Sequence, residues 1–204
     1  MCRFKSGIIL KNKVVVAPGE NDSHSDLLES LGIKDDYFGA TNVFVRAELV
    51  PVNNEWWIDP ADEPDKWRFI VDQDMRPEWF DESEHEKIFR EAVCDWWKEH
   101  VLVDQKLEEL SSGYYLLKRC EVKKLLNDVK VLLDSSQVGK MWDSSQVGEM
   151  RDRSQVGEMR DSSQVGEMRD RSTARDFKNW PKVKIWVSPE GTFEMVAHQN
   201  KSEE

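Results

Sequence analysis

The sequence predicts an α+β N-terminal domain of ββαββα type over residues 1–115. A short β-solenoid with about two nonapeptide repeats per coil is predicted over residues 116–204. Two observations support this fold class. A nine-residue unit recurs almost unchanged from Asp134 onward, and an ordered series of strand and helix patterns precedes it. The chain has 204 residues, which is enough for one or two small domains.

The repeat excludes the simplest regular structures. Its units read DSSQVGKMW, DSSQVGEMR, DRSQVGEMR, DSSQVGEMR and a degenerate DRSTARDFK. Nine residues of α-helix turn through about 900°, so Val138 and Val147 would face opposite sides, and each glycine would cost about 1 kcal/mol. A straight strand fails too, because its side chains alternate with period two and nine is odd. The chain must turn once per repeat, which predicts a β-solenoid with interior ladders of Val and Met.

The second position of each unit indicates how many repeats form one coil. It alternates over the last four units, which carry Ser144, Arg153, Ser162 and Arg171. This 18-residue period predicts two nonamers per coil, with Arg153 directly above or below Arg171. Such repeats are typical of a duplicated scaffold and also of a ligand-reading face, and the pattern leaves both interpretations open.

The solenoid is expected to run over residues 119–187. The Val-x-x-Leu/Met signature already occurs at Val122/Leu125 and Val129/Leu132, and Phe177 closes the series. The segment 182–196, KVKIWVSPEGTFEMV, has the pattern of a β-hairpin that caps the last coil. Solenoid ends or edges left open would favour a homo-oligomer.

The N-terminal domain is read from five patterned segments. Residues 4–18 predict a hairpin, and SHSDLLESLG predicts a short helix that Ser23 caps. Residues 42–52 and 66–74 alternate as strands. A second helix opens with a capping box formed by Ser83 and Glu86. The predicted apolar side of that helix is Ile88, Phe89, Ala92, Val93, Trp96 and Trp97.

Charge is concentrated in one part of the chain. The net charge is −11, and residues 53–110 hold 18 acidic against 7 basic side chains together with six of the nine tryptophans. An acidic surface disfavours direct nucleic-acid binding, which needs Lys and Arg to neutralise phosphates. It favours a protein partner with a basic surface, or mimicry of nucleic-acid charge. The predicted binding surface consists of Trp56, Trp57, Glu82, Glu84, Glu91, Arg153 and Arg171.

Other functional classes are less well supported. No apolar run reaches the ~18 residues of a membrane span, and the N-terminus lacks the pattern of a signal peptide, so a cytoplasmic protein is expected. Three widely spaced cysteines indicate neither a disulfide framework nor a zinc site. No cofactor or metal is expected. Trp56 and Trp57 suggest carbohydrate stacking as one alternative, although such tryptophans more often belong to a core.

An enzymatic alternative centres on Cys2. Removal of Met1 would expose an N-terminal cysteine whose own amine can act as a base. This start is similar to that of the N-terminal-nucleophile hydrolases, including glutamine amidotransferase domains, although the glycine after the cysteine is missing. His24, in the first turn of its helix, is the candidate base, and Asp72 or Glu48 would orient it. An ordinary strand position for Cys2 is the competing interpretation.

The segments MCRFKSGIIL, SHSDLLESLGI, FVRAEL and VDQDMRPEWF, followed by Val-x-x-Met repeats, resemble a set of phage- and bacteria-encoded proteins with an α+β head and a repetitive β-solenoid tail. The resemblance implies this architecture and a phage or gut-bacterial setting, and it transfers no catalytic residue. The leading hypothesis is a non-catalytic interaction protein. Its most specific form inhibits a host nucleic-acid-handling or defence protein through the acidic surface, in the host cytoplasm.

Overall fold

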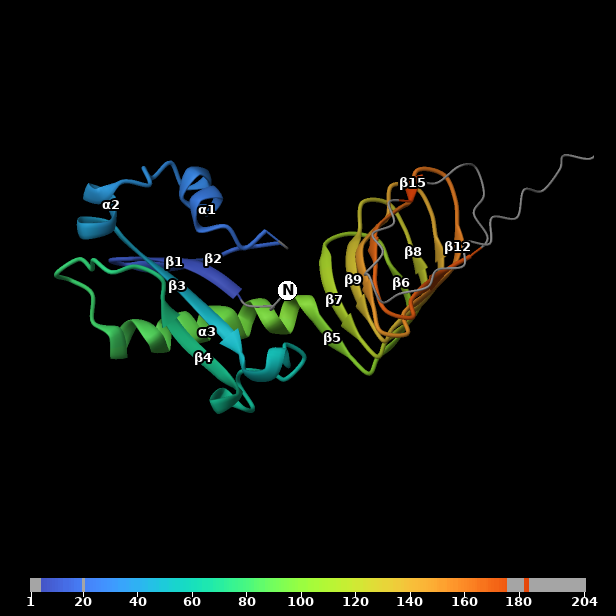
Figure 1. The fold of residues 1–204 in the computed structure, drawn as a ribbon, viewed down its shortest axis with the longest axis horizontal. Coiled ribbons are helices and arrows are strands. Elements are labelled where there is room, and N and C mark those ends of the chain that lie inside the picture. The colour runs from blue at the N-terminus through green and yellow to red at the C-terminus, as the bar shows by residue number, and fades with distance from the viewer. Residues whose placement is uncertain (1–4, 20, 176–181, 184–204) are drawn as a thin grey trace, which may run out of the picture. The chain divides into compact units, whose positions relative to one another are not determined.

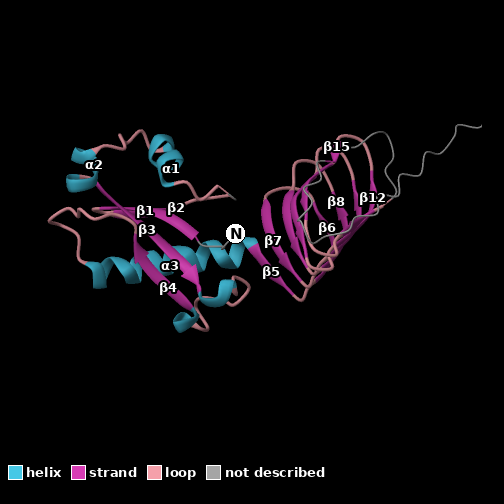
Figure 2. Cartoon of the chain, in the orientation of Figure 1, coloured by secondary structure: helices cyan, strands magenta, loops and turns pink. Residues whose placement is uncertain are grey.

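The computed structural model describes residues 5–19, 21–175 and 182–183. The chain divides into two units, Met1–Glu99 and His100–Glu204 (Figure 1). The first unit is α+β and the second is a β-solenoid, as the sequence predicts (Figure 2). Most of the capping hairpin predicted over 182–196 lies outside the described residues, and so does Phe177.

The solenoid begins before residue 116, where the sequence analysis places the boundary. Strand β6 (Lys106–Leu110) pairs with the next coil, so that Leu107 faces Val122 and Leu110 faces Leu125. These leucines occupy the Val and Met positions of the later repeats. The Val-x-x-Met signature does not detect them, because the ladder selects for apolar volume rather than for these residue types.

The N-terminal unit is built on a four-stranded antiparallel sheet. Its strands are β1 (Lys5–Leu10), β2 (Lys13–Val16), β3 (Phe44–Pro51) and β4 (Trp67–Val71), in the order β2-β1-β3-β4. The sheet supplies two faces, because neighbouring side chains of a strand point in opposite directions. On β1, Ile8 packs on one face with Leu28, whereas a Cβ on Gly7 would meet Phe89 on the other.

Helices cover both faces of this sheet (Figure 1). Helix α1 (His24–Ser30) and the short α2 (Tyr37–Asn42) lie on one side, and α3 (Glu82–His100) lies on the other. The 3-10 turns Val52–Asn54 and Pro64–Lys66 lie between β3 and β4. The ββαββα order is confirmed, with α2 as an addition that the sequence did not indicate.

The two predicted helix starts have different outcomes. Ser23 caps α1 as expected, because its side chain accepts a hydrogen bond from the backbone N–H of Asp26 at 3.2 Å. The capping box at Ser83 is wrong. Helix α3 begins at Glu82, and Asp81 caps it by accepting a hydrogen bond from the N–H of Glu84 at 2.8 Å. Aspartate is as good an N-cap as serine, and it occurs earlier in this sequence.

The buried face of α3 also differs from the prediction at one position. Its buried residues are His85, Phe89 and Val93, whereas Ile88 is 41% exposed. Residues four apart lie almost above one another on a helix, so these three form a single line. Ile88 lies about 100° away from that line and faces outward.

Parallel strands form the two sheets of the solenoid, one on each side of every coil. One sheet has the order β14-β12-β10-β8-β6 and the other β15-β13-β11-β9-β7-β5. Apart from β6, the strands are β5 (Val101–Val103), β7 (Tyr114–Lys118), β8 (Glu121–Leu125), β9 (Lys130–Asp134), β10 (Gln137–Met141), β11 (Gln146–Arg151), β12 (Gln155–Met159), β13 (Gln164–Met168), β14 (Thr173–Ala174) and β15 (Lys182–Val183).

The predicted two nonamers per coil are confirmed for the regular repeats. Gln137 pairs with Gln155, eighteen residues later, but also with Glu121, only sixteen residues earlier. The coils before the perfect repeats are therefore shorter. In one of them the expected signature Val129/Leu132 is wrong, because Val131 and Leu133 face Val147 and Met150 across an irregularity in the ladder.

The interior of the repeats is a stack of valines and methionines. Val138, Val147, Val156 and Val165 are at most 2% exposed, and Met141, Met150, Met159 and Met168 at most 5%, as predicted. The glycines at positions 139, 157 and 166 follow from the close stacking of the strands. A Cβ on Gly157 would lie 2.5 Å from the carbonyl oxygen of Gly139, and one on Gly139 would lie 2.7 Å from that of Lys123.

From the second unit onward, each repeat begins with an aspartate at a corner of the coil that requires a left-handed backbone. In the first unit Ser135, and not Asp134, has this conformation. Asp143, Asp152, Asp161 and Asp170 have φ between 54° and 58°, a region that Asp and Asn tolerate better than most residues. The corners stack, since the N–H of Arg171 donates to the carbonyl of Asp152 at 2.8 Å. Arg153 and Arg171 lie at equivalent corners of successive coils, and both are exposed.

Candidate functional site

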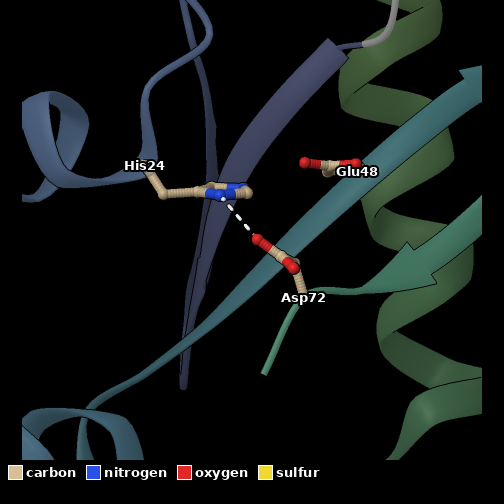
Figure 3. A group of neighbouring side chains, drawn as sticks. All are labelled: His24, Glu48 and Asp72. Carbon is tan, nitrogen blue, oxygen red and sulfur yellow. Dashed lines mark ion pairs between the residues drawn. The ribbon is translucent and has the colours of Figure 1, made fainter. Parts of the chain in front are cut away.

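Three side chains that the sequence analysis selected meet on the α1 side of the N-terminal sheet (Figure 3). His24 is the first residue of α1, Glu48 lies on β3, and Asp72 directly follows β4. The pairing of Ser6 with Glu48 puts Glu48 on the face that carries Ile8 and α1. One nitrogen or oxygen atom of each of the three side chains lies within 4.8 Å of the other two.

The His24 ring is held at both of its nitrogens. Nε2 lies 3.1 Å from the backbone oxygen of Ala47, and Nδ1 lies 3.4 Å from Oδ2 of Asp72. The His24 side chain is 9% exposed and that of Asp72 is 59% exposed. Of the two orienting residues that the sequence offered, Asp72 makes the closer contact. The site is therefore formed by a buried imidazole next to a solvent-facing carboxylate.

Further charges lie beside this group. The Lys5 ammonium is 2.8 Å from Oδ1 of Asp22 and 4.2 Å from the centre of the Trp96 ring. Burial lowers the pKa of Lys5 and raises that of Asp22, and the attraction between the two partly offsets both shifts. Ser6 completes the contact, because its hydroxyl donates to the backbone oxygen of Asp22 at 2.6 Å.

The pKa of Glu48 is raised above its ordinary value. Burial is the main cause, and the like charges of Asp72 and Asp22 add to it, whereas the attraction of His24 acts in the opposite direction. The three carboxyl groups of Asp22, Glu48 and Asp72 thus share one region with the His24 imidazole. Such a concentration of titratable groups is typical of sites that bind a cation or transfer protons.

The proposed nucleophile Cys2 lies outside the described residues. The two described cysteines, Cys94 and Cys120, are free thiols. Burial raises the pKa of both thiols, which disfavours the reactive thiolate. Neither of them offers the nucleophile that the enzymatic alternative requires.

Comparison with known proteins assigns the chain to no family. No family model, curated protein or solved structure matches it. None of the helices that the structure describes is long and apolar enough to span a membrane. The chemistry of the chain's own side chains is therefore the basis for proposing a function.

Helix α3 carries a second candidate site, which we call the acidic stripe. It consists of Glu84, Glu91, Asp95 and Glu99, all exposed. Spacings of seven, four and four residues place them within about 80° of one another around the helix. The exposed Ile88 lies within the stripe, and Lys87 and Lys98 lie along one margin. Glu82, also predicted for the binding surface, lies about 160° from Glu84 and pairs with Arg76.

Trp56 is buried, which corrects its place in the predicted binding surface, whereas Trp57 is half-buried. Trp56 is 3% exposed and packs edge-on against Trp57 with ring centres 5.8 Å apart. The indole N–H of Trp97 donates to the carbonyl of Trp56, and that of Trp67 donates to the carbonyl of Ile58. A buried Trp56 cannot stack on a sugar. The indoles instead hold the irregular segment between β3 and β4 against α3.

On the solenoid, the predicted Arg153 and Arg171 are accompanied by rows of charge pairs. Arg151, Arg160 and Arg169 bind Glu149, Glu158 and Glu167 of their own strands, and Arg169 also reaches Glu149 of the neighbouring coil at 3.2 Å. The Arg169–Glu149 pair joins two stacked coils, and the other pairs neutralise charge within single strands. The regular alternation leaves the solenoid surface close to neutral along its length, which suits a scaffold.

Proposed function

We propose that this protein is a non-catalytic interaction module whose N-terminal unit docks a protein with a basic surface along the acidic stripe. The single observation that supports this best is the gathering of four exposed carboxylates on one face of α3. Glu84, Glu91 and Asp95 form no side-chain ion pair with any residue within the described ranges. Their charge is thus available to an outside partner.

The shape of the stripe favours a protein partner. Helix α3 has 19 residues and is about 28 Å long, and the stripe covers most of that length. Ile88, 41% exposed, lies among the acids and offers an apolar contact at the centre of the interface. Successive acids of the stripe lie about 6–10 Å apart along the helix axis, whereas the phosphates of a nucleic-acid strand lie about 3.4 Å apart. The negative charge of the stripe is therefore sparser than that of a nucleic-acid strand.

The sequence-based hypothesis of charge mimicry is one form of this proposal. Its partner would be a nucleic-acid-handling or defence protein, because such proteins present Lys and Arg at the surface that contacts phosphates. The solenoid would act as a rigid arm, since its interior is a regular ladder and its surface charges are paired within and between coils. In this form the protein would compete with nucleic acid for the same basic surface.

A matched pair of charge-reversal variants tests the proposal. The stripe variant carries Glu84→Lys, Glu91→Lys and Asp95→Lys, and the control carries Asp62→Lys, Glu63→Lys and Asp65→Lys. All six side chains are exposed and belong to the same unit. Each variant replaces three acidic residues by lysine, so the change in net charge is identical. C-terminally tagged wild type and control should retain a basic partner from cell lysate, and the stripe variant should lose it.

The purified partner then supplies the decisive measurement. Its Kd for the wild type should rise steeply as salt increases from about 50 to 300 mM, because the interface is electrostatic. Competition by DNA would support the mimicry form, and its absence would leave a basic partner of another kind. Equal loss of binding in both variants, or binding that salt does not change, would contradict docking on α3.

A second candidate function is hydrolysis by an N-terminal Cys2. The observation that favours it is the meeting of His24, Asp72 and Glu48, the base and orienting residues that this alternative requires. Intact-mass spectrometry should then show that Met1 is removed, and a thiol probe should label Cys2 faster than Cys94 or Cys120. Retention of Met1 together with slow labelling of Cys2 would eliminate the hydrolase.

A further inference from the structure

We propose that His24, Glu48 and Asp72 bind one divalent transition-metal cation on the α1 face of the N-terminal sheet. This site is independent of the acidic stripe, which lies on α3 across the sheet. The three residues are far apart in the sequence and show no ligand spacing, so only the order of the strands reveals them. Figure 3 shows the imidazole and both carboxylates converging.

The separations between the ligand atoms fit a single cation. Nitrogen and oxygen ligands at about 2.0–2.2 Å from an ion lie about 3.0–3.5 Å from one another. Nδ1 of His24 and Oδ2 of Asp72 are 3.4 Å apart, and all three ligand atoms lie within 4.8 Å. The Glu48 side chain makes no hydrogen bond or ion pair with the described residues, so it is free to rotate, and such a rotation would close the remaining gap.

The backbone prepares His24 as a ligand. Its Nε2 lies 3.1 Å from the carbonyl oxygen of Ala47, a position from which Nε2–H donates. The lone pair of the neutral ring then lies on Nδ1 and faces the Asp72 carboxylate. Histidines that bind metals usually donate their second N–H in this way, which fixes both the tautomer and the orientation of the ring.

Among the described residues, no lysine or arginine side chain pairs with either carboxylate of this group. When the His24 ring is neutral, its Nδ1 lone pair faces two carboxyl groups, and a bound cation would supply the positive charge that a protonated ring otherwise supplies. Two basic residues of the same sheet are engaged elsewhere, since Lys5 pairs with Asp22 at 2.8 Å and Arg46 pairs with Asp35.

The donor set selects the class of ion. One imidazole nitrogen with two carboxylate oxygens suits Zn²⁺, Fe²⁺ or Mn²⁺, whereas Ca²⁺ and Mg²⁺ sites are built mainly from oxygen. Three protein ligands leave at least one coordination position for water. The 59% exposure of Asp72 opens that side to solvent. A cation on Nδ1 would also prevent His24 from acting as the base of a Cys2 hydrolase.

Titration of the chelator-treated full chain with Zn²⁺, followed by calorimetry, tests the site. The wild type should bind one Zn²⁺ per chain at this site. His24→Ala and Asp72→Asn should each weaken binding at least tenfold. Asp74→Asn is the matched control, because Asp74 is an exposed aspartate two residues away and lies outside the cluster. Its affinity should stay within twofold of the wild type. Equal affinity of all four proteins would overturn the proposal.

A measurement on the wild type alone guards against variants that fail to fold. Mn²⁺ broadens the NMR signals of nuclei near its binding site, and it has little affinity for thiols. Substoichiometric Mn²⁺ should broaden the ring signals of His24 before those of His85 and His100. Unchanged His24 signals, or equal broadening of all three rings, would overturn the proposal whatever the variants do.

Discussion

At the scale of single residues, one buried ion pair joins two early strands of the solenoid, β7 and β9. Lys118 and Asp134 are 8% and 7% exposed, and their Nζ and Oδ1 atoms are 2.7 Å apart. Burial by itself raises the pKa of Asp134, but hydrogen bonds with Asp152 and Lys118 and the charge of the Lys118 ammonium lower it overall. The pKa of Asp152 is raised, chiefly by its hydrogen bond with Asp134. The buried Lys118 ammonium thus interacts with the carboxyl groups of both Asp134 and Asp152.

We expect Asp134→Asn to lower the free energy of unfolding by about 1–3 kcal/mol at pH 7, because Lys118 would lose its close partner. A carboxyl group with a lowered folded pKa stabilises the fold above its unfolded pKa of about 3.9, and this contribution is lost as the pH falls through the folded pKa. Chemical denaturation at neutral and acid pH should therefore show the deficit shrinking in acid.

Asp152→Asn is the control for this prediction. It removes the carboxyl group whose pKa is raised, so its effect at pH 7 should be small or stabilising. A larger loss for Asp152→Asn than for Asp134→Asn would show that the lysine depends on the other carboxylate. A deficit that does not change with pH would show that packing, rather than charge, explains the cost.

At the scale of elements, the N-cap of α3 fixes the residue at which the helix begins. The Asp81 carboxylate accepts from the Glu84 N–H at 2.8 Å, and the Asp81 backbone oxygen accepts from the His85 N–H at 2.9 Å. This start aligns His85, Phe89 and Val93 with the sheet. The acidic stripe, with Ile88 among the acids, consequently faces away from the sheet.

We expect Asp81→Ala to cost about 1 kcal/mol of stability, because two roles of the N-cap, hydrogen bonding and attraction to the helix dipole, are lost together. Ser83→Ala should change the melting temperature little, since Ser83 lies inside the first turn. Thermal melts of the two variants decide between the caps. A greater loss for Ser83→Ala would restore the capping box that the sequence suggested.

At the scale of the whole molecule, the solenoid is a stack in which each coil contacts only its neighbours. Equivalent residues of the regular coils are eighteen residues apart in both sheets. Stability in such a stack is approximately the sum of the coils and their interfaces. The number of coils can therefore change without a change of fold, provided that each strand stays in its own sheet.

Deletion of residues 152–169, one full coil, should preserve the solenoid with a lower melting temperature. After this deletion Thr173 and Lys182 would meet β10 and β11 as they now meet β12 and β13. Deletion of only 152–160 would move every later strand to the opposite sheet and should cost more. Circular dichroism and melting of both variants check this expectation. Equal stability of the two deletions would contradict the two-sided coil.

The sequence was sufficient to select three of the candidate site residues but not to establish that they meet. His24, Asp72 and Glu48 were selected as a base and its orienting carboxylates. Their convergence depends on the strand order β2-β1-β3-β4 and on the pairing of Ser6 with Glu48. Non-local strand pairing leaves no periodic trace in the N-terminal unit, which has no repeats. The acidic stripe was half predictable: Glu84 and Glu91 belong to it, whereas Glu82 faces elsewhere.

The sequence by itself determined the solenoid, because a nine-residue period with one Val, one Gly and one Met per unit permits few ways of burying its apolar side chains. Local periodicity also indicated the ββαββα order of the N-terminal unit, apart from the added helix α2. Tertiary structure alone decided that Trp56 is buried, that Leu107 and Leu110 belong to the first coils, and that Val131 replaces Val129 in the ladder. Each of these depends on what lies opposite the residue in space, and contacts between distant segments are not encoded in local pattern.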